Sequence, residues 1–112
     1  MIKRKIENQI LHSLKPANVT GLFGARRTGK TVLMHEIKNK LKQNKVLLVQ
    51  GDNLDVADIL SSQRLSILKR FISGYDYLFI DEAQKIPNIG QSLKLLVDSI
   101  ANLSIFITGS SA

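Results

Sequence analysis

Eight residues near position 24 have the types and spacing that bind phosphate groups. Gly24 and Gly29 bracket four variable residues, and Lys30 and Thr31 follow directly, which fits the pattern G-x-x-x-x-G-K-[ST]. Glycines let backbone amides turn toward phosphate oxygens, a lysine adds a positive charge, and a threonine hydroxyl is a ligand for Mg²⁺. The pattern predicts binding of ATP or a close relative, with magnesium, by Gly24, Ala25, Arg26, Arg27, Thr28, Gly29, Lys30 and Thr31.

Two features of this loop have alternative interpretations. A glycine-containing turn with an exposed lysine also fits the eight-residue pattern, so its position between a strand and a helix is part of the argument. Backbone amides, not side chains, meet the phosphates in such a loop. The side chains of Arg26 and Arg27 are therefore expected to be exposed, with a role at an interface as the alternative.

Two acidic residues follow an apolar run in the second half of the chain. Leu78-Phe79-Ile80 precedes Asp81-Glu82, which has the form of a Walker B motif. Asp81 is predicted to hold Mg²⁺ together with Thr31. Glu82 is predicted to act as the general base, because a carboxylate beside the metal can take a proton from the attacking water. The alternative for this pair is a solvated strand end.

Small hydroxyl residues follow the last apolar run of the chain. Thr108 and Ser110 come after Ile105-Phe106-Ile107 and are candidates to hold the attacking water or to contact the γ-phosphate. The predicted catalytic set is thus Lys30, Glu82, Thr108 and Ser110. An ordinary Gly-Ser turn is the alternative for the last two. Gln84 is either a polar loop residue or a reporter of nucleotide state to a partner.

The segments that must position these residues alternate between two hydrophobic patterns. Short apolar runs predict strands over 19–23, 46–49, 77–80 and 104–108, and helical spacing predicts helices over 2–14, 29–41, 59–72 and 93–100. The third helical pattern is interrupted around 61–62. Nearly continuous apolar strands that alternate with helices indicate a parallel sheet covered on both faces. The predicted class is α/β.

Composition adds limits on the kind of protein. The 112 residues, 44% of them hydrophobic, fit one domain over 1–112, with a helix in residues 1–15. No apolar run approaches the roughly 20 residues of a membrane span, and no secretory pattern is present, so we expect a cytoplasmic protein without membrane contact. Residues 1–45 carry a net charge of +9 and the rest carry −2. Contact with nucleic acid is therefore an open alternative.

Three segments taken together resemble one family. Gly24 to Thr31, Leu78 to Pro87 and Ile107 to Ser111 make the chain similar to the bacterial and archaeal AAA-like ATPases, in which an N-terminal P-loop domain precedes a C-terminal domain of poorly defined, nuclease-like character. The resemblance covers the chain from its first helix to Ala112. It implies a three-layer P-loop fold in which the fourth strand lies between the first and third. It also implies a sensor role for Thr108 or Ser110.

The resemblance also implies parts that this sequence does not show. A fifth core strand, an arginine finger, a second sensor and the C-terminal domain would follow Ala112, so the chain looks like an N-terminal fragment with four of five core strands. An arginine finger can contribute about a thousandfold or more in rate, so turnover by the chain alone is expected to be slow or absent. An uncovered first strand predicts self-association.

Three functions are compatible with the sequence. The first is binding of ATP and Mg²⁺, with hydrolysis of ATP in the intact protein. The second is a nucleotide-dependent interaction module, associated with nucleic acid, that has no turnover of its own. The third, a P-loop kinase, is disfavoured because the sequence shows no lid or acceptor site and Asp81-Glu82 favours water as the acceptor.

Overall fold

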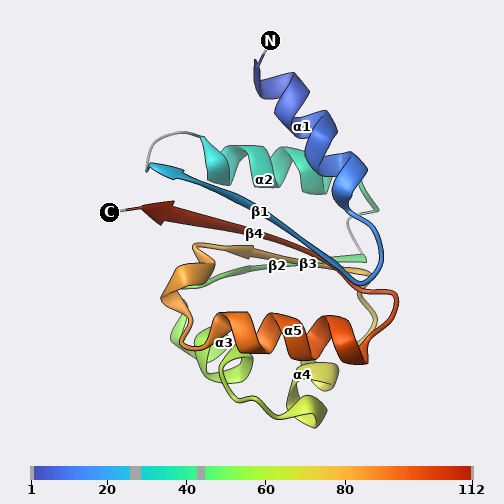
Figure 1. The fold of residues 1–112 in the computed structure, drawn as a ribbon, viewed down its shortest axis with the longest axis vertical. Helices are drawn as coiled ribbons and strands as arrows, with labels where there is room; N and C mark the ends of the chain where they lie inside the picture. Colours follow the sequence, from blue (N-terminus) through green and yellow to red (C-terminus); the bar gives the residue numbers. More distant parts are fainter. Residues whose placement is uncertain (1, 26–28, 43–44, 112) are drawn as a thin grey trace.

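A computed structural model describes residues 2–25, 29–42 and 45–111 of the chain. Its described residues form five α-helices, four strands and one short 3₁₀ turn, η2 (Figure 1). In chain order these are α1 Ile2–Ser13, β1 Asn18–Ala25, α2 Lys30–Asn39, β2 Val46–Gln50, α3 Leu54–Leu60, α4 Leu65–Ile72, β3 Tyr77–Asp81, η2 Ala83–Lys85, α5 Ile89–Ser99 and β4 Ser104–Ser111.

The four strands form one parallel sheet in the order β1-β4-β3-β2. The predicted α/β class is confirmed, as is the implied position of the fourth strand between the first and third. Parallel strands need a crossover between neighbours, and the helices supply it. All four carboxyl ends therefore meet at one edge of the sheet, where Asp81 ends β3 and Ser111 ends β4.

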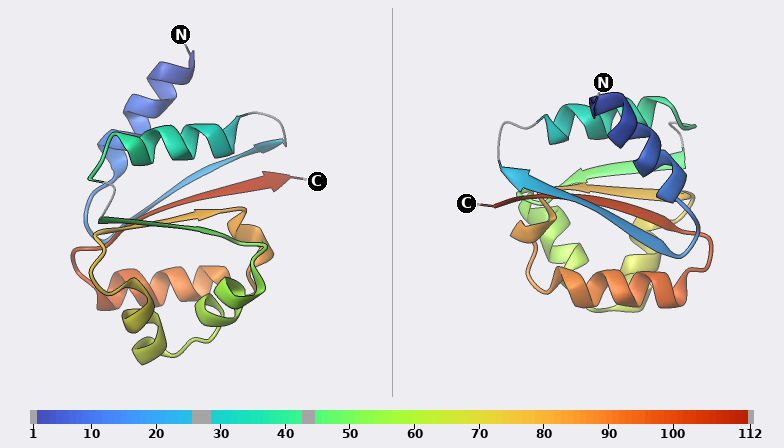
Figure 2. Two further views of the ribbon diagram at one scale, coloured as in Figure 1. Left: turned by 180° about the vertical axis from the view of Figure 1, so that it is seen from behind. Right: turned by 45° about the horizontal axis from the view of Figure 1, so that its top comes forward.

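The helices cover both faces of the sheet and make three layers (Figure 2). On one side α1 and α2 enclose a core that includes Met34, Ile37 and the edge-to-face pair Phe79 and Phe106, with ring centroids 5.2 Å apart. On the other side α3, α4 and α5 cover a larger aliphatic core. Two buried faces explain why β3 is almost continuously apolar and why β4 has the apolar run Ile105 to Ile107.

The crossover between β2 and β3 differs from the expected single helix. It contains two helices, α3 and α4, which are separated near the Ser61-Ser62 interruption seen in the sequence. The first of them begins at Leu54, several residues before the expected start, because the Asn53 side chain caps it by accepting a hydrogen bond from the Val56 amide at 3.2 Å. Gln63, with φ of 58°, lies in the connection between the two helices.

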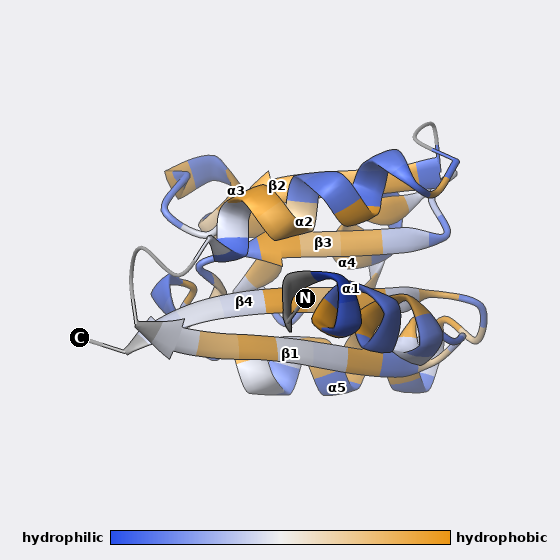
Figure 3. Cartoon of the chain, turned by 90° about the horizontal axis from the view of Figure 1, so that it is seen from above, coloured by the Kyte–Doolittle hydropathy of each residue, from blue (hydrophilic) through white to orange (hydrophobic). Residues whose placement is uncertain are grey.

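The strand β1 lies at an outer edge of the sheet, as the view from above shows (Figure 3). Its even-numbered side chains Thr20 and Leu22 are half-buried, whereas Val19 and Phe23 are 37% and 64% exposed. The expected exposure of the first strand is present, and self-association through it stays a prediction. Among the described residues, no helix is both long and apolar enough to cross a membrane.

Candidate functional site

The segment that the sequence predicts to bind phosphate lies where that mechanism requires it, between the end of β1 and the start of α2. Gly29 precedes the helix with φ of 78°, a conformation that glycine adopts at little cost. Lys30 is only 7% exposed, and its ammonium donates to the Gly24 carbonyl at 3.1 Å. The predicted Arg26, Arg27 and Thr28 lie outside the described residues. The loop therefore delivers one largely buried cation beside a helix N-terminus, which attracts anions.

Asp81 is the centre of a hydrogen-bond network at the carboxyl edge of the sheet. The residue is 2% exposed. The Thr31 hydroxyl donates to Asp81 Oδ2 at 2.8 Å, and the Thr108 hydroxyl donates to Asp81 Oδ1 at 2.5 Å. These three residues come from α2, β3 and β4, so the network joins the start of a helix to two central strands. Each oxygen of the Asp81 carboxyl group therefore accepts a hydrogen bond from one threonine hydroxyl.

Thr108 connects the two acidic residues. Its side chain is fully buried, and its single hydroxyl both donates to Asp81 and accepts from the Glu82 amide at 3.0 Å. The alternative of an ordinary Gly-Ser turn is wrong for this segment, because β4 continues through Gly109 and Ser110. Thr108 is therefore a fixed part of the sheet, with its hydroxyl directed at the acidic pair.

Replacing Thr108 with valine should destabilise the fold without changing its shape. Valine has the same size but leaves the Glu82 amide without its acceptor and Asp81 Oδ1 without its donor. Buried polar groups left unpaired cost about 1–3 kcal/mol. Urea unfolding should show this loss for Thr108→Val and little loss for Thr108→Ser, which keeps the hydroxyl. Equal stability of the valine variant and the wild type would contradict the network.

Glu82 has a strained backbone and a restrained side chain. Its φ of 56° places it in the left-handed region, which non-glycine residues seldom adopt. The Gln84 amide donates to one carboxylate oxygen at 2.7 Å, and the Ser110 hydroxyl donates to the other at 2.9 Å. The hydrogen bond from Gln84 is the main reason that the pKa of Glu82 lies below its ordinary value of 4.5; burial opposes this, and Ser110 and the charges of Lys30 and Lys85 add to it. The carboxylate is thus ionised at neutral pH.

Gly51 supports the acidic pair from the neighbouring strand. It directly follows β2, and its amide donates to the Asp81 carbonyl at 2.7 Å. A Cβ at this position would collide with the carbonyl oxygen of Glu82. A glycine after a strand is common, so the sequence alone gives no signal for this contact. Its contact with Glu82 depends on the pairing of β2 with β3, in which Gln50 lies opposite Asp81.

The substitution Gly51→Ala should destabilise the protein, because the methyl group must displace the backbone of Glu82. Overpacking of this kind costs about 1–3 kcal/mol. The matched control is Gly90→Ala in α5, where an added Cβ meets nothing within 4 Å, and a helical glycine replaced by alanine gains about 0.5–1 kcal/mol. Thermal unfolding should therefore move in opposite directions for the two variants. A melting temperature of Gly51→Ala at or above the wild-type value would contradict the close approach.

The donor set at this edge fits a magnesium ion that is shared with a nucleotide. The described residues contain no group of three or more His, Cys, Asp and Glu side chains arranged to hold a metal. Mg²⁺ commonly uses only one or two protein oxygens and takes the rest from water and phosphate. The Thr31 hydroxyl donates its one proton to Asp81, so the lone pairs of the Thr31 oxygen remain available to a cation. Thr31 and Asp81 are compatible with that coordination.

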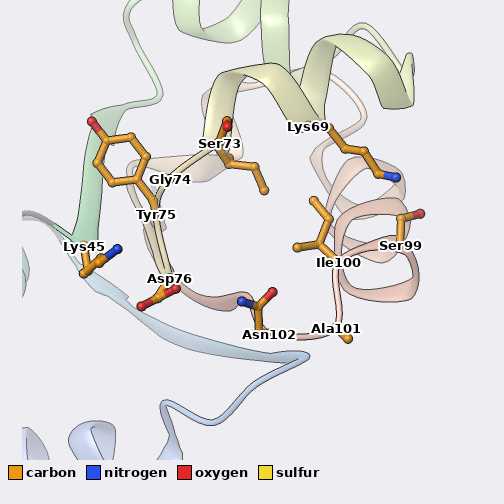
Figure 4. A pocket seen from close by; sticks show the side chains of 11 residues that line it. Lys45, Lys69, Ser73, Gly74, Tyr75, Asp76, Ser99, Ile100, Ala101 and Asn102 are labelled. Carbon is orange, nitrogen blue, oxygen red and sulfur yellow. The ribbon is translucent and has the colours of Figure 1, made fainter.

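A separate hollow lies at the opposite edge of the sheet. It has a volume of about 450 Å³, and its lining includes Lys45 and Asp76, which directly precede β2 and β3, and Asn102 in the connection before β4 (Figure 4). The side chains of Lys45 and Asp76 lie on one side of it and Lys69 and Ser99 on the other. None of the predicted site residues lines it. The hollow is therefore distinct from the network at the carboxyl edge.

The structure brings most of the predicted residues together. Lys30 is close enough to Glu82 for its charge to lower the pKa of that carboxyl, Thr108 contacts both acidic residues, and Ser110 contacts Glu82. The sequence left open which hydroxyl residue belongs to the site, and the structure places both there. The hydrogen bond from Gln84 to Glu82 was missed, because a spacing of two residues gives no signal until the backbone turns at Glu82.

Comparison with known proteins adds three findings. A family model described as an AAA domain matches residues 16–112. An uncharacterized protein of Methanocaldococcus jannaschii is 30% identical over 114 residues, which cover 100% of this chain and 24% of that protein. A solved DNA replication initiation factor superposes with a TM-score of 0.65 at 18% identity, over 98% of this chain and 37% of that chain, and it shares the fold. The chain thus spans about a quarter of the archaeal relative.

Proposed function

The chain belongs to the AAA domain family, a nucleotide-binding, ATPase-like class, and from this premise we propose that it binds ATP with Mg²⁺ and hydrolyses ATP within the intact protein. The observation that carries the proposal is the network that joins Thr31, Asp81, Glu82 and Thr108 at one edge of the sheet, with the charge of Lys30 close enough to act on Glu82. A cytoplasmic location, where ATP is abundant, is part of the proposal.

Binding would depend on the loop and the start of α2. Backbone amides of 24–31 and the positive end of the helix dipole attract the phosphates, and Lys30 adds a full charge that is already largely shielded from water. A magnesium ion held by Thr31 and Asp81 would neutralise part of the phosphate charge. Asp81 keeps the Thr31 hydroxyl in one orientation, so the site is preorganised before the ligand arrives.

Hydrolysis would use Glu82 as the proton acceptor. Water attacks the γ-phosphorus, its proton passes to the carboxylate, and the bond from the γ-phosphorus to the oxygen that bridges to the β-phosphate breaks to leave ADP and phosphate. The lowered pKa keeps Glu82 ionised and so able to accept that proton. Gln84 and Ser110 occupy one site on each oxygen, and a carboxylate has about four acceptor sites, so acceptor capacity remains.

One observation favours a second candidate, a nucleotide-dependent interaction module without turnover. Glu82 is held by two donors at once, which orients it but also limits its movement toward a water molecule. Such a chain would bind nucleotide, and a partner would bind it or release it according to whether nucleotide is bound. A DNA replication initiation factor is among the structures with this fold, which makes nucleic acid a partner worth testing.

Parallel assays of binding and phosphate release separate the two candidates. The chain should bind a fluorescent ATP analogue only when Mg²⁺ is present, and chelation of the metal should release most of it. Phosphate release is measured on the intact protein, where release above the rate of free ATP supports hydrolysis, whereas saturable binding with no released phosphate supports the interaction module. Absence of binding by the folded chain would contradict both.

A further inference from the structure

The helix α1 is fixed to the domain by one face only. Ile6, Ile10, Leu11 and Leu14 belong to the core that α2 and the sheet share, and Ile10 is 6% exposed. At the carboxyl end of the helix, the side-chain amide of Asn18 donates to the backbone carbonyl of Ser13 at 2.7 Å, which connects the helix to the amino end of β1. The amino-terminal half of the helix projects away from the sheet (Figure 1). This helix lies before the residues that the AAA domain model matches.

The opposite face of α1 is polar, and its charged residues are both positive. Five exposed residues border a shallow hollow of about 470 Å³, and we call them the α1 outer face: Arg4, Lys5, Asn8, Gln9 and His12. Their spacing places them on adjacent turns of one side of the helix. Seen from above, the helix is largely hydrophilic (Figure 3).

The acidic residue of this helix, Glu7, does not neutralise the positive charge of the α1 outer face. Glu7 is 6% exposed and forms an ion pair with Lys40, so its carboxylate is turned toward α2. Among the described residues that border the hollow, none carries a carboxylate. Arg4 and Lys5 therefore keep their two charges beside the amides of Asn8 and Gln9. Guanidinium, ammonium and amide donors together are the groups that contact phosphate and sugar oxygens in nucleic-acid complexes.

We propose that the α1 outer face binds the phosphate backbone of duplex nucleic acid. Insertion into a membrane surface needs an exposed apolar face on the helix, and the apolar face of α1 is already buried against α2. Protein interfaces are anchored mainly by buried tryptophan, tyrosine and arginine side chains, and the outer face has an arginine but no tryptophan or tyrosine. Phosphate contacts need no such anchor and are independent of base sequence. The proposal does not rest on hydrolysis of ATP.

A salt titration with paired variants tests this surface. Binding of a short fluorescein-labelled DNA duplex to the full chain would be followed by anisotropy over a range of salt concentrations. Each lost phosphate contact removes about 0.9 from the slope of log affinity against log salt, so Arg4→Gln with Lys5→Gln should lower the slope by about 2. The matched control is Lys69→Gln with Arg70→Gln, an exposed adjacent pair on α4 with the same change in charge. The control should keep a slope near the wild-type value.

Several results would overturn the proposal. An equal fall of slope in both variant pairs would mean that net charge, and not the α1 outer face, attracts the duplex. Loss of duplex binding in Lys30→Ala would place the phosphate contacts in the loop instead. Lack of binding by the wild type at low salt, or binding only to phosphatidylserine vesicles, would exclude a nucleic-acid partner for this face. Circular dichroism checks that each variant is folded.

Discussion

The substitution Lys30→Ala should abolish saturable binding of ATP at micromolar to millimolar concentrations. Lys30 is the largely buried cation of the loop, and its ammonium lies 3.1 Å from the Gly24 carbonyl at the end of β1. Removing one partner of a desolvated charge pair costs about 2–5 kcal/mol, which corresponds to a roughly 30-fold to several-thousand-fold weaker affinity. Competition against a fluorescent ATP analogue measures this loss.

A control on the same helix makes the result specific. Lys38→Ala also removes one positive charge from α2, but Lys38 lies in its last turn, about two turns from the loop. Its affinity for the nucleotide should stay within a few-fold of wild type. Both variants should melt close to the wild-type temperature, because neither change opens an apolar cavity. Wild-type affinity in folded Lys30→Ala would remove the loop from the proposed site.

The second large effect is expected for Glu82→Gln, which should spare nucleotide binding and stop phosphate release. The amide has the shape of the carboxylate and retains an acceptor oxygen for Gln84 or Ser110, but it cannot take the proton from water. General-base catalysis contributes roughly 10²–10⁴ to the rate, so turnover of the intact protein should fall by at least about a hundredfold. Single-turnover measurements separate this loss from any change in binding.

The matched control for Glu82→Gln is Asp98→Asn. This exposed side chain on α5 forms an ion pair with Lys94 at 3.2 Å and belongs to the opposite layer from the loop. The control should turn over ATP at the wild-type rate. If Glu82→Gln turns over at the same rate as well, another group must accept the proton, and the proposed role of Glu82 is wrong.

Much of the site follows from strand and helix patterns in the sequence. The apolar run 77–80 identified β3, and a carboxylate directly after a buried strand must reach the carboxyl edge of a parallel sheet. The positions of Lys30 and Thr31 could be predicted in the same way, because these residues begin the helix that follows β1. Local periodicity was enough to place these residues, since each lies at the end of its own element.

The choice between Thr108 and Ser110 needed information that no local pattern contains. Residues 108 and 110 share one face of β4, and the partner of each depends on the register of β4 against β3, in which Ile80 lies opposite Ile107. That register directs Thr108 at Asp81 and the Glu82 amide, whereas Ser110, two residues farther along, meets the Glu82 carboxylate. Pairing between distant segments is a tertiary property.

Gly51 and Gln84 show the same limit for residues outside any motif. Gly51 contacts the acidic pair because β2 lies beside β3, and Gln84 reaches Glu82 because the backbone turns through a φ of 56° at that residue. Glycine after a strand and glutamine in a loop are too common to indicate such contacts. Both contacts restrain the acidic pair, so it is held from two sides that the motif alone does not reveal.

Titration calorimetry of the 112-residue chain with a non-hydrolysable ATP analogue is the most direct test of the central claim, that this edge of the sheet binds Mg-ATP. We predict saturable binding at one site in the presence of Mg²⁺, and loss of most of the heat when the metal is chelated. A folded chain that gives no heat of binding at millimolar analogue with Mg²⁺ would contradict the claim.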